Sequence, residues 1–402
     1  MITVVGIGAD GWAGLAAGSR EAVAAAEVLV GSARQLELVP ASEAERVPLP
    51  SPLLPALPGL LAAHEGRKVC VLASGDPMFF GIGSTLARLL GAGALRVLPH
   101  VSSLSLACAR LGWPVEKVTA VSLLGRPLAA LAAELRPGAR VLVLGPDGDA
   151  PAAVAGLLTA RGYGASTLTV LSGLGSPEEA RLSGTAATWP ATPAAALNVT
   201  AVECVPDPGT RPLARVPGLP DDAFDHDGQL TKRDVRAVTL SRLAPLPGEL
   251  LWDVGAGAGS IAIEWMRTHP ACAAVAVESH PARCARIRRN ADTLGVPALR
   301  LVEGRAPGAL AGLPAPDAVF VGGGATTPGV LETSWAALRP GGRLVVNAVT
   351  LESEATLAHW HAAHGGDLTR LSVQHASPIG GFTGWRTSMP VTVWSATKGD
   401  IS

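Results

Sequence analysis

The sequence predicts an α/β protein that contains two domains. Its 402 residues exceed the size at which a single hydrophobic core is usual. Hydrophobic residues make up 48% of the chain and charged residues only 16%, and 47 glycines and 33 prolines supply tight connections. Apolar strand-like runs alternate with segments of helical length in both halves, which is the pattern of βαβ units around a parallel sheet.

In the N-terminal half this alternation extends from residue 1 to about residue 172, with runs such as Lys68–Ala73. The following stretch is less regular and ends in the strand-like run Ala196–Val202. Prolines then cluster, and neither a helix nor a central strand continues through such a cluster. The predicted division is a first domain, a proline-rich linker and a second domain, at residues 1–203, 204–225 and 226–402.

In the C-terminal half a helical segment at 231–243 precedes five runs typical of buried strands, separated by segments of helical length. The five runs are Glu249–Val254, Ala273–Glu278, Ala298–Val302, Asp317–Val321 and Gly342–Asn347. A last pair of strands is expected near 368–375 and 389–395. The second domain is therefore predicted to be a doubly wound, Rossmann-like sheet with an antiparallel edge.

Composition narrows the class of partner. The formal net charge is −1, and one Tyr and five Phe offer few stacking platforms, so nucleic acid is not expected as a partner. The chain opens on an apolar run without a basic leader, and no apolar run reaches the roughly 18 residues of a membrane span. The five cysteines form no CxxC pair, which argues against disulfides or a metal site. We expect a cytoplasmic homo-oligomer that binds no metal and no membrane.

A glycine-rich loop follows the first strand of the second domain. It reads Asp253-Val254-Gly255-Ala256-Gly257-Ala258-Gly259 and runs directly into a helical segment, so glycines stand where the backbone turns sharply and approaches a ligand. This pattern predicts a nucleotide-type cofactor. The dinucleotide fingerprint has the spacing Gly-x-Gly-x-x-Gly, whereas this loop has Asp-x-Gly-x-Gly-x-Gly, which favours S-adenosylmethionine over NAD.

Three further loops support this prediction. Glu278 ends the next strand, nineteen residues after Gly259, and a carboxylate there accepts hydrogen bonds from both hydroxyls of a ribose. Gly304 and Ala306 follow the third strand, and Gly322 follows the fourth. The alternative is a glycine turn that merely tightens a strand–helix junction. Four loops that converge on one edge of a sheet argue against it.

The first domain carries two sets of candidate ligand residues. Gly6, Gly8 and Gly11 satisfy Gly-x-Gly-x-x-Gly, which leaves a nicotinamide-dependent oxidoreductase as an alternative. However, the second strand-like run ends in Gly31-Ser32, without the acid that a nicotinamide-linked ribose needs. The more specific set consists of two short polar segments that each follow a later strand, Gly75-Asp76-Pro77 and Ser102-Ser103.

At this point a family resemblance appears in the second domain. Asp227–Arg236, the glycine loop, Gly304–Pro307, Asp317–Gly323 and Asn347–Glu352 resemble the precorrin decarboxylating methyltransferases of cobalamin biosynthesis. The resemblance implies a class I methyltransferase domain and a cofactor-binding role for Thr231, for which a helix N-cap is the alternative. The cofactor residues predicted here are Thr231, Asp253, Gly255, Ala256, Gly257, Ala258, Gly259, Glu278, Gly304, Ala306 and Gly322.

The first domain resembles the tetrapyrrole methylase family, whose members bind S-adenosylmethionine in a cleft between two α/β lobes. The resemblance implies a two-lobed fold and a second cofactor site, lined by Gly75, Asp76, Pro77, Ser102 and Ser103. Three residues depart from the pattern of that family, namely His100, Leu124 and Ser172. An ordinary turn followed by a serine N-cap is the alternative for the two segments.

Together the resemblances imply a bifunctional C-methyltransferase of corrin-ring biosynthesis that binds two S-adenosylmethionine molecules. It would methylate carbons 5 and 15 of a precorrin and decarboxylate the acetate on ring C. Methyl transfer requires in-line approach and exclusion of water, so no catalytic triad is expected. The tetrapyrrole bears many carboxylates, which makes basic side chains substrate candidates: Lys232, Arg233, Arg236, Arg126 and His100. A non-catalytic tetrapyrrole-binding protein with the same fold is the alternative.

Overall fold

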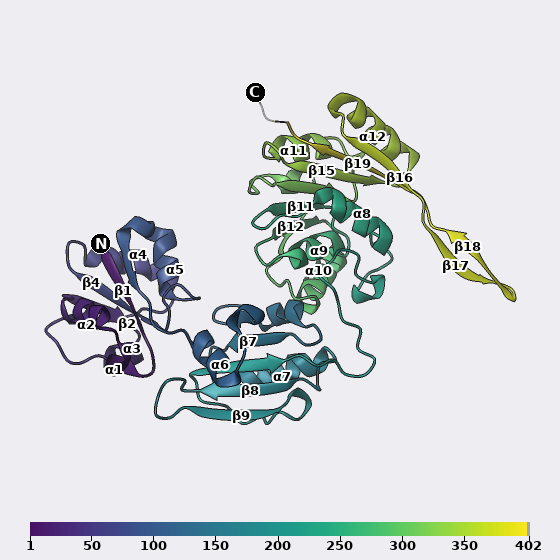
Figure 1. The fold of residues 1–402 in the computed structure, drawn as a ribbon. Coiled ribbons are helices and arrows are strands. Elements are labelled where there is room, and N and C mark those ends of the chain that lie inside the picture. Colours follow the sequence, from purple (N-terminus) through teal and green to yellow (C-terminus); the bar gives the residue numbers. More distant parts are fainter. Residues whose placement is uncertain (400–402) are drawn as a thin grey trace. The chain divides into compact units, whose positions relative to one another are not determined.

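The computed structural model describes residues 1–399. It divides into two compact units, which are described separately (Figure 1). The N-terminal unit comprises Met1–Leu128 and Pro137–Thr210, and the C-terminal unit comprises Ala129–Arg136 and the chain from Arg211 onward. In the described part of the chain, no helix has both the length and the apolar character needed to cross a membrane.

The first lobe of the N-terminal unit is a parallel five-stranded sheet with helices on both faces. The strand order is β3-β2-β4-β1-β5. The strands are β1 (Ile2–Ile7), β2 (Val28–Gly31), β3 (Glu45–Pro48), β4 (Val69–Ser74) and β5 (Leu95–Leu98). Helices α1 (Gly11–Gly14), α2 (Ala17–Ala24) and α3 (Ala33–Glu37) lie on the side of one hydrophobic cluster, and α4 (Leu53–Ala63) and α5 (Ile82–Leu90) on the side of the other. The inner strands β1, β2 and β4 are largely buried and read as apolar runs, whereas the edge strands β3 and β5 are partly exposed.

The second lobe is a mixed five-stranded sheet in the order β6-β7-β10-β8-β9. The strands are β6 (Thr119–Ser122), β7 (Arg140–Leu144), β8 (Thr167–Ser172), β9 (Ala180–Thr185) and β10 (Asn198–Glu203). Only β6 and β7 pair in parallel. Its helices are α6 (Ser103–Leu111) and α7 (Ala150–Ala160). The sequence loses regularity after residue 172 because β9 is an exposed edge strand.

The C-terminal unit is built on a seven-stranded sheet in the order β13-β12-β11-β14-β15-β19-β16. Five strands pair in parallel, namely β11 (Leu250–Val254), β12 (Ala273–Glu278), β13 (Arg300–Glu303), β14 (Ala318–Val321) and β15 (Arg343–Ala348). Strand β19 (Val391–Thr397) runs antiparallel to both β15 and β16 (Asp367–Leu371). The predicted doubly wound sheet with an antiparallel edge is confirmed.

Helices cover both faces of this sheet. Helices α8 (Arg233–Leu243), α9 (Ser260–Thr268) and α10 (Pro281–Thr293) share one hydrophobic cluster with residues such as Leu251, and α11 (Val330–Ala337) and α12 (Leu351–His364) share another with Trp252. Alternate residues of β11 thus enter opposite cores. Leu219 and Phe224, inside the stretch predicted as a linker, are buried in the first of these clusters.

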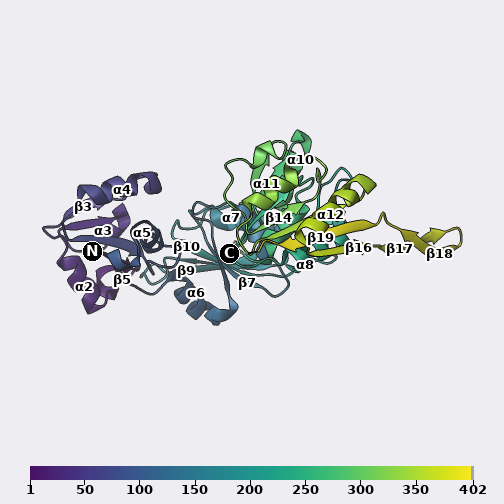
Figure 2. The same cartoon turned by 90° about the horizontal axis from the view of Figure 1, so that it is seen from above.

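A hairpin that the sequence analysis did not predict lies between β16 and β19. It consists of β17 (Gln374–Ile379) and β18 (Phe382–Thr387), and it extends away from the main sheet (Figure 1 and Figure 2). One strand was expected near 368–375, whereas β16 ends at Leu371 and a new strand begins at Gln374. The hairpin is exposed on both faces, so it shows no core-facing alternation in the sequence.

Candidate cofactor and substrate sites

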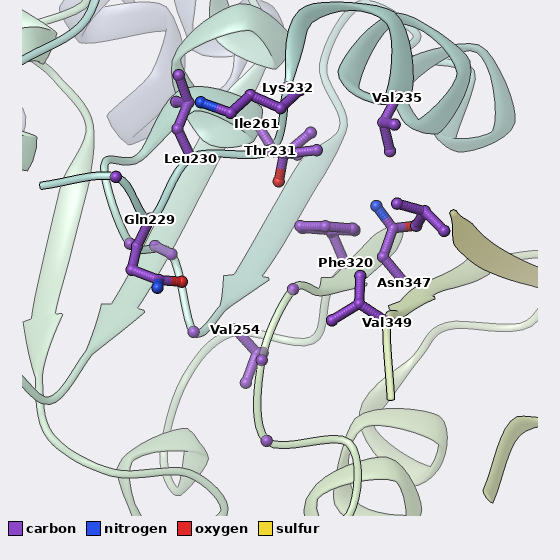
Figure 3. Close-up of a pocket in the computed structure, with 18 of the residues that line it drawn as sticks. Gln229, Leu230, Thr231, Lys232, Val235, Val254, Ile261, Phe320, Asn347 and Val349 are labelled. Atoms are coloured by element: carbon purple, nitrogen blue, oxygen red, sulfur yellow. The ribbon is translucent and has the colours of Figure 1, made fainter. Parts of the chain in front are cut away.

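The C-terminal unit contains a cavity of about 970 Å³ at the carboxyl ends of its parallel strands. In a doubly wound sheet this edge is where ligands bind. The cavity is lined by most of the cofactor residues predicted for this unit, namely Thr231, Gly255, Ala256, Gly257, Glu278, Gly304, Ala306 and Gly322. Figure 3 shows the side chains of Thr231, Phe320 and Asn347 gathered around it. The structure therefore brings together loops that are up to about 90 residues apart in the sequence.

Glycine is required in the loop after β11 for two reasons. Gly255 and Gly257 have φ angles of +72° and +60°, which residues with side chains rarely adopt. A Cβ atom on Gly255 would also lie 3.0 Å from the carbonyl oxygen of Gly323, in the loop after β14. The two loops therefore meet backbone to backbone and leave bare main chain facing the cavity.

Glu278 ties the end of β12 to this glycine loop. Its side chain is buried, and its Oε2 accepts a hydrogen bond from the Gly257 N–H at 2.9 Å. Its Oε1 accepts one from the His280 N–H, also at 2.9 Å. An ionised carboxylate has about four acceptor positions, so both oxygens keep capacity for the hydroxyls of a ribose.

The remaining predicted residues of the loop lie behind the cavity wall. Asp253 is buried, and its Oδ2 accepts a hydrogen bond from the Ala262 N–H at 3.0 Å, near the start of α9. Ala258 is buried, and Gly259, with φ of +76°, is the N-cap of α9. None of the three lines the cavity. They shape the loop, which is what the glycine-turn alternative predicted for these positions.

The buried carboxyl of Asp253 should make the stability of the protein depend on pH. Burial, with a smaller contribution from nearby Glu278, raises the pKa of the Asp253 carboxyl to about 7. Between the ordinary pKa near 4 and this value the folded protein holds a proton that the unfolded chain has lost, so the free energy of unfolding falls as pH rises. Asp253→Asn lacks this titration. The free energy of unfolding of the variant, relative to that of the wild type, should therefore rise by on the order of 1 kcal/mol for each unit of increasing pH across this window.

Urea unfolding of both proteins at pH 5, 6 and 7 measures this difference. Parallel stability profiles for wild type and variant would contradict the raised pKa of Asp253. A variant that gains stability relative to the wild type as the pH falls from 7 to 5 would reverse the sign of the effect and contradict it as well.

The structure separates the three basic candidates at the start of α8. Lys232 lines the cavity, with its Nζ 3.9 Å from Asp221. Arg233 does not line it and donates from Nε to the carbonyl oxygen of Gly218 at 2.8 Å. The prediction that Arg236 contacts the substrate is wrong, because its side chain is fully buried and its Nε lies 2.6 Å from Glu264 Oε1. It cannot reach a substrate.

Arg236 instead holds the loop that carries Thr231. Its guanidinium donates to the carbonyl oxygens of Thr231 and Leu219 and lies 3.1 Å from Asp221. Glu264 in turn accepts hydrogen bonds from the Gly218 and Leu219 N–H groups. The buried Arg236–Glu264 pair therefore holds the segment that precedes α8 against α9.

In the N-terminal unit the end of β1 and the loops after β4 and β5 meet at one point. A Cβ atom on Gly6 would lie 2.1 Å from the carbonyl oxygen of Gly75 and 2.6 Å from the backbone nitrogen of His100. One on Gly75 would lie 3.3 Å from Ser102 Cα and 3.6 Å from the Ser103 nitrogen. Two of the predicted segments, Gly75–Pro77 and Ser102-Ser103, are therefore adjacent in the fold.

Both segments also do what the turn-and-cap alternative predicted. Asp76 Oδ1 accepts a hydrogen bond from the Met78 N–H at 2.8 Å, and Ser102 Oγ caps α6 through the Ser105 N–H at 3.1 Å. These local bonds are compatible with ligand binding and do not establish it. The cofactor role of Gly75, Asp76, Pro77, Ser102 and Ser103 stays a prediction.

The other two basic candidates lie in the N-terminal unit. His100 Nε2 is 3.2 Å from Asp10 Oδ1, and a Cβ on Gly8 would come within 2.7 Å of the same nitrogen. The Arg126 guanidinium lies over the Phe80 ring, 5.0 Å from its centroid. Their substrate roles stay predictions.

Sequence reasoning missed several residues that line the C-terminal cavity. Asn347 lies on the last parallel strand, where a polar residue near the carboxyl end is a usable signal, and its Nδ2 donates to Thr239 Oγ1 at 3.0 Å. Phe320 lies on β14 and is buried. His375 and Arg386 come from the hairpin, which gave no signal in the sequence.

A doubly wound sheet with a glycine loop and an acidic strand end at its ligand-binding edge defines a class of enzyme with a nucleotide-type cofactor. Comparison with known families narrows this class. The model of the family "Tetrapyrrole (Corrin/Porphyrin) Methylases" matches residues 1–190, and that of the family "Precorrin methyltransferase domain" matches residues 222–398.

Relatives match over the whole chain. A precorrin-6Y C(5,15)-methyltransferase [decarboxylating] from Sinorhizobium sp is 50% identical over 399 residues, which cover 99% of this chain and 96% of that protein. The protein of the same description from Mycobacterium tuberculosis (strain CDC 1551 / Oshkosh) is 48% identical, with coverages of 99% and 100%. The chain belongs to the precorrin-6Y C(5,15)-methyltransferase (decarboxylating) family and is an S-adenosylmethionine-dependent methyltransferase.

A solved structure also aligns with part of the chain. The crystal structure of the C-terminal domain of precorrin-6Y C5,15-methyltransferase from Rhodobacter capsulatus is 47% identical. It covers 46% of this chain and 100% of that one, with a TM-score of 0.44.

Proposed function

We propose that this chain methylates carbons 5 and 15 of a precorrin and removes carbon dioxide from the acetate side chain of ring C. The C-terminal unit would carry out the methylation at carbon 15 and the decarboxylation, and the N-terminal unit the methylation at carbon 5. The observation that carries the proposal is the cavity of about 970 Å³, at which the predicted cofactor loops of the C-terminal unit meet. Relatives with the corresponding description match 99% of the chain.

Each unit would bind one molecule of S-adenosylmethionine, whose sulfonium supplies an electrophilic methyl group. In the C-terminal unit the bare backbone of Gly255 and Gly257 would approach the cofactor, and the Glu278 carboxylate would accept hydrogen bonds from its ribose. In the N-terminal unit the adjacent Gly75–Pro77 and Ser102-Ser103 segments would form the second site.

The contribution of the protein to both reactions would be mainly positional. Methyl transfer to an electron-rich carbon needs in-line approach and exclusion of water. Phe320, Val349 and Leu371 give the cavity apolar wall that excludes water. In the decarboxylation the bond between the acetate methylene and the carboxylate breaks, carbon dioxide leaves, and the electron pair passes into the conjugated ring, where a proton is taken up. Cations beside the cavity favour that flow of charge.

The protein would work as a cytoplasmic homo-oligomer on a small tetrapyrrole, without nucleic acid or a membrane. Cys70, Cys108, Cys272 and Cys284 are buried free thiols, which fits a reducing compartment. Burial raises the pKa of the Cys70 thiol to about 12, so it is not a nucleophile.

Turnover tests the proposal. Incubation of the full chain with reduced precorrin-6 and S-adenosylmethionine should give a product that has gained two methyl groups and lost one carbon dioxide, as measured by mass spectrometry. A product with unchanged mass would favour the non-catalytic tetrapyrrole-binding alternative. Omission of S-adenosylmethionine is the control, and it should abolish the gain of both methyl groups.

A further inference from the structure

The cavity of the C-terminal unit has a second wall that the cofactor loops do not form. The cofactor loops follow β11, β12, β13 and β14. This wall comes from the β17–β18 hairpin and the strands next to it, β16 and β19, which lie toward the opposite end of the strand order. Its residues include His375, Ser377, Arg386, Thr387 and Met389. The cavity thus extends from the glycine loop to the hairpin.

Two basic side chains stand opposite each other on this hairpin. His375 and Arg386 are direct partners in the antiparallel β17–β18 ladder, so their side chains leave the same face of the hairpin. Both line the cavity and both are exposed. The acid nearest to His375 is Asp234, with Oδ2 at 4.0 Å from Nε2.

Among residues 1–399, Arg386 differs from most of the cations that line the cavity because its guanidinium has no partner. Within residues 1–399 its guanidinium forms no hydrogen bond and no ion pair. Arg283, in contrast, is paired with Asp227 at 3.0 Å, and Lys232 is 3.9 Å from Asp221. Among the described residues the guanidinium of Arg305 also has no partner; it lies in the loop after β13, between Gly304 and Ala306, on the cofactor side of the cavity. Within residues 1–399, Arg386 is therefore the unpartnered guanidinium of the hairpin wall.

The wall around this pair carries apolar as well as polar residues. Leu371, Val373, Met389 and Val391 line the same part of the cavity. An apolar wall next to an unpartnered guanidinium fits a ligand that has a flat apolar body and acidic side chains at its edge. A guanidinium binds a carboxylate through two parallel hydrogen bonds, and the imidazole ring opposite it offers a further hydrogen-bond donor.

We propose that His375 and Arg386 bind a carboxylate side chain of the precorrin, so that the β17–β18 hairpin is a substrate-recognition element of the C-terminal unit. This inference rests on the proposed function, because it takes the ligand to be the tetrapyrrole substrate. S-adenosylmethionine also carries a carboxylate, and binding of that group by Arg386 is the outcome that the experiment has to separate from substrate binding.

The test uses the full chain with Arg386→Gln, which keeps a polar side chain and removes the charge. Equilibrium binding of reduced precorrin-6 to the enzyme saturated with S-adenosylhomocysteine, followed by absorbance, should weaken about tenfold, since a lost charged hydrogen bond has an effect of this order. The affinity for S-adenosylhomocysteine, measured by calorimetry, should stay unchanged. His375→Gln should weaken precorrin binding in the same direction.

Arg370→Gln is the matched control. Arg370 lies on β16 with a side chain that is 60% exposed, pairs with Glu354 at 3.4 Å and does not line the cavity. Its replacement should leave both affinities at the wild-type values.

Each outcome decides the inference. Unchanged precorrin affinity in Arg386→Gln would overturn it, and weaker S-adenosylhomocysteine binding would assign the guanidinium to the cofactor and overturn it as well. Wild-type protein that binds reduced precorrin-6 and releases no carbon dioxide would overturn the proposed function while leaving the hairpin as a tetrapyrrole site. Wild-type protein that does not bind reduced precorrin-6 would overturn both.

Discussion

Glu264→Ala should lower the free energy of unfolding of the C-terminal unit by about 3–5 kcal/mol, the cost of removing one member of a buried ion pair, with Asp221 as the carboxylate that stays beside Arg236. Glu264 is 2% exposed and Arg236 is fully buried, so water cannot replace the lost carboxylate. The change also removes the acceptor of the Gly218 and Leu219 N–H groups, which Glu264 holds at 2.6 and 3.0 Å. The stretch that leads into Thr231 would lose its attachment to α9.

Differential scanning calorimetry and urea unfolding of the full chain measure this loss. Arg339→Ala is the control, because Arg339 pairs with Asp317 at 2.7 Å but its side chain is 51% exposed, and such pairs contribute at most about 1 kcal/mol. Cofactor affinity should also fall in Glu264→Ala, since Arg236 donates to the carbonyl oxygen of Thr231. A loss no larger than that of the control would show that the buried pair contributes no more than a surface pair.

The same ion pair shows where sequence reasoning about the site stops. The sequence around Arg236 has charges of both signs at the start of a helix, a pattern that does not reveal what packs against the helix. Leu219 and the acids Asp221 and Glu264 bury the guanidinium, and they come from a predicted linker and from another helix. Whether Arg236 contacts the substrate or anchors the preceding loop therefore depends on tertiary packing.

The central parallel strands could be predicted closely, because strands such as β12 and β14 are buried on both faces and read as apolar runs. Strand β12 occupies Ala273–Glu278, the predicted range, and the acid at its end lies at the cavity as expected. The wall formed by the hairpin could not be predicted in this way. The side chains of β17 and β18 are mostly exposed, so neither their pairing nor the approach of Arg386 to the cavity leaves a periodic pattern.

Gly6→Ala should remove the proposed cofactor site of the N-terminal unit and leave that of the C-terminal unit intact. The added carbon would lie 2.1 Å from the carbonyl oxygen of Gly75 and 2.6 Å from the His100 nitrogen, and both are main-chain atoms that cannot rotate away. The end of β1 and the loops after β4 and β5 would have to separate, and these two loops carry the predicted ligand residues. Overpacking of this kind costs about 1–3 kcal/mol or more.

Calorimetric titration with S-adenosylhomocysteine should therefore give two equivalents per chain for the wild type and one for Gly6→Ala, while carbon dioxide release from reduced precorrin-6 persists. Gly18→Ala is the matched control, because Gly18 lies in α2 with no atom within 4 Å of an added Cβ, and alanine is favoured in a helix by about 1 kcal/mol. It should retain two equivalents. One equivalent in the wild type would refute the N-terminal site, and two in Gly6→Ala would show that binding does not depend on the contact between these loops. Loss of carbon dioxide release in Gly6→Ala, with C-terminal binding intact, would instead contradict the assignment of decarboxylation to the C-terminal unit alone.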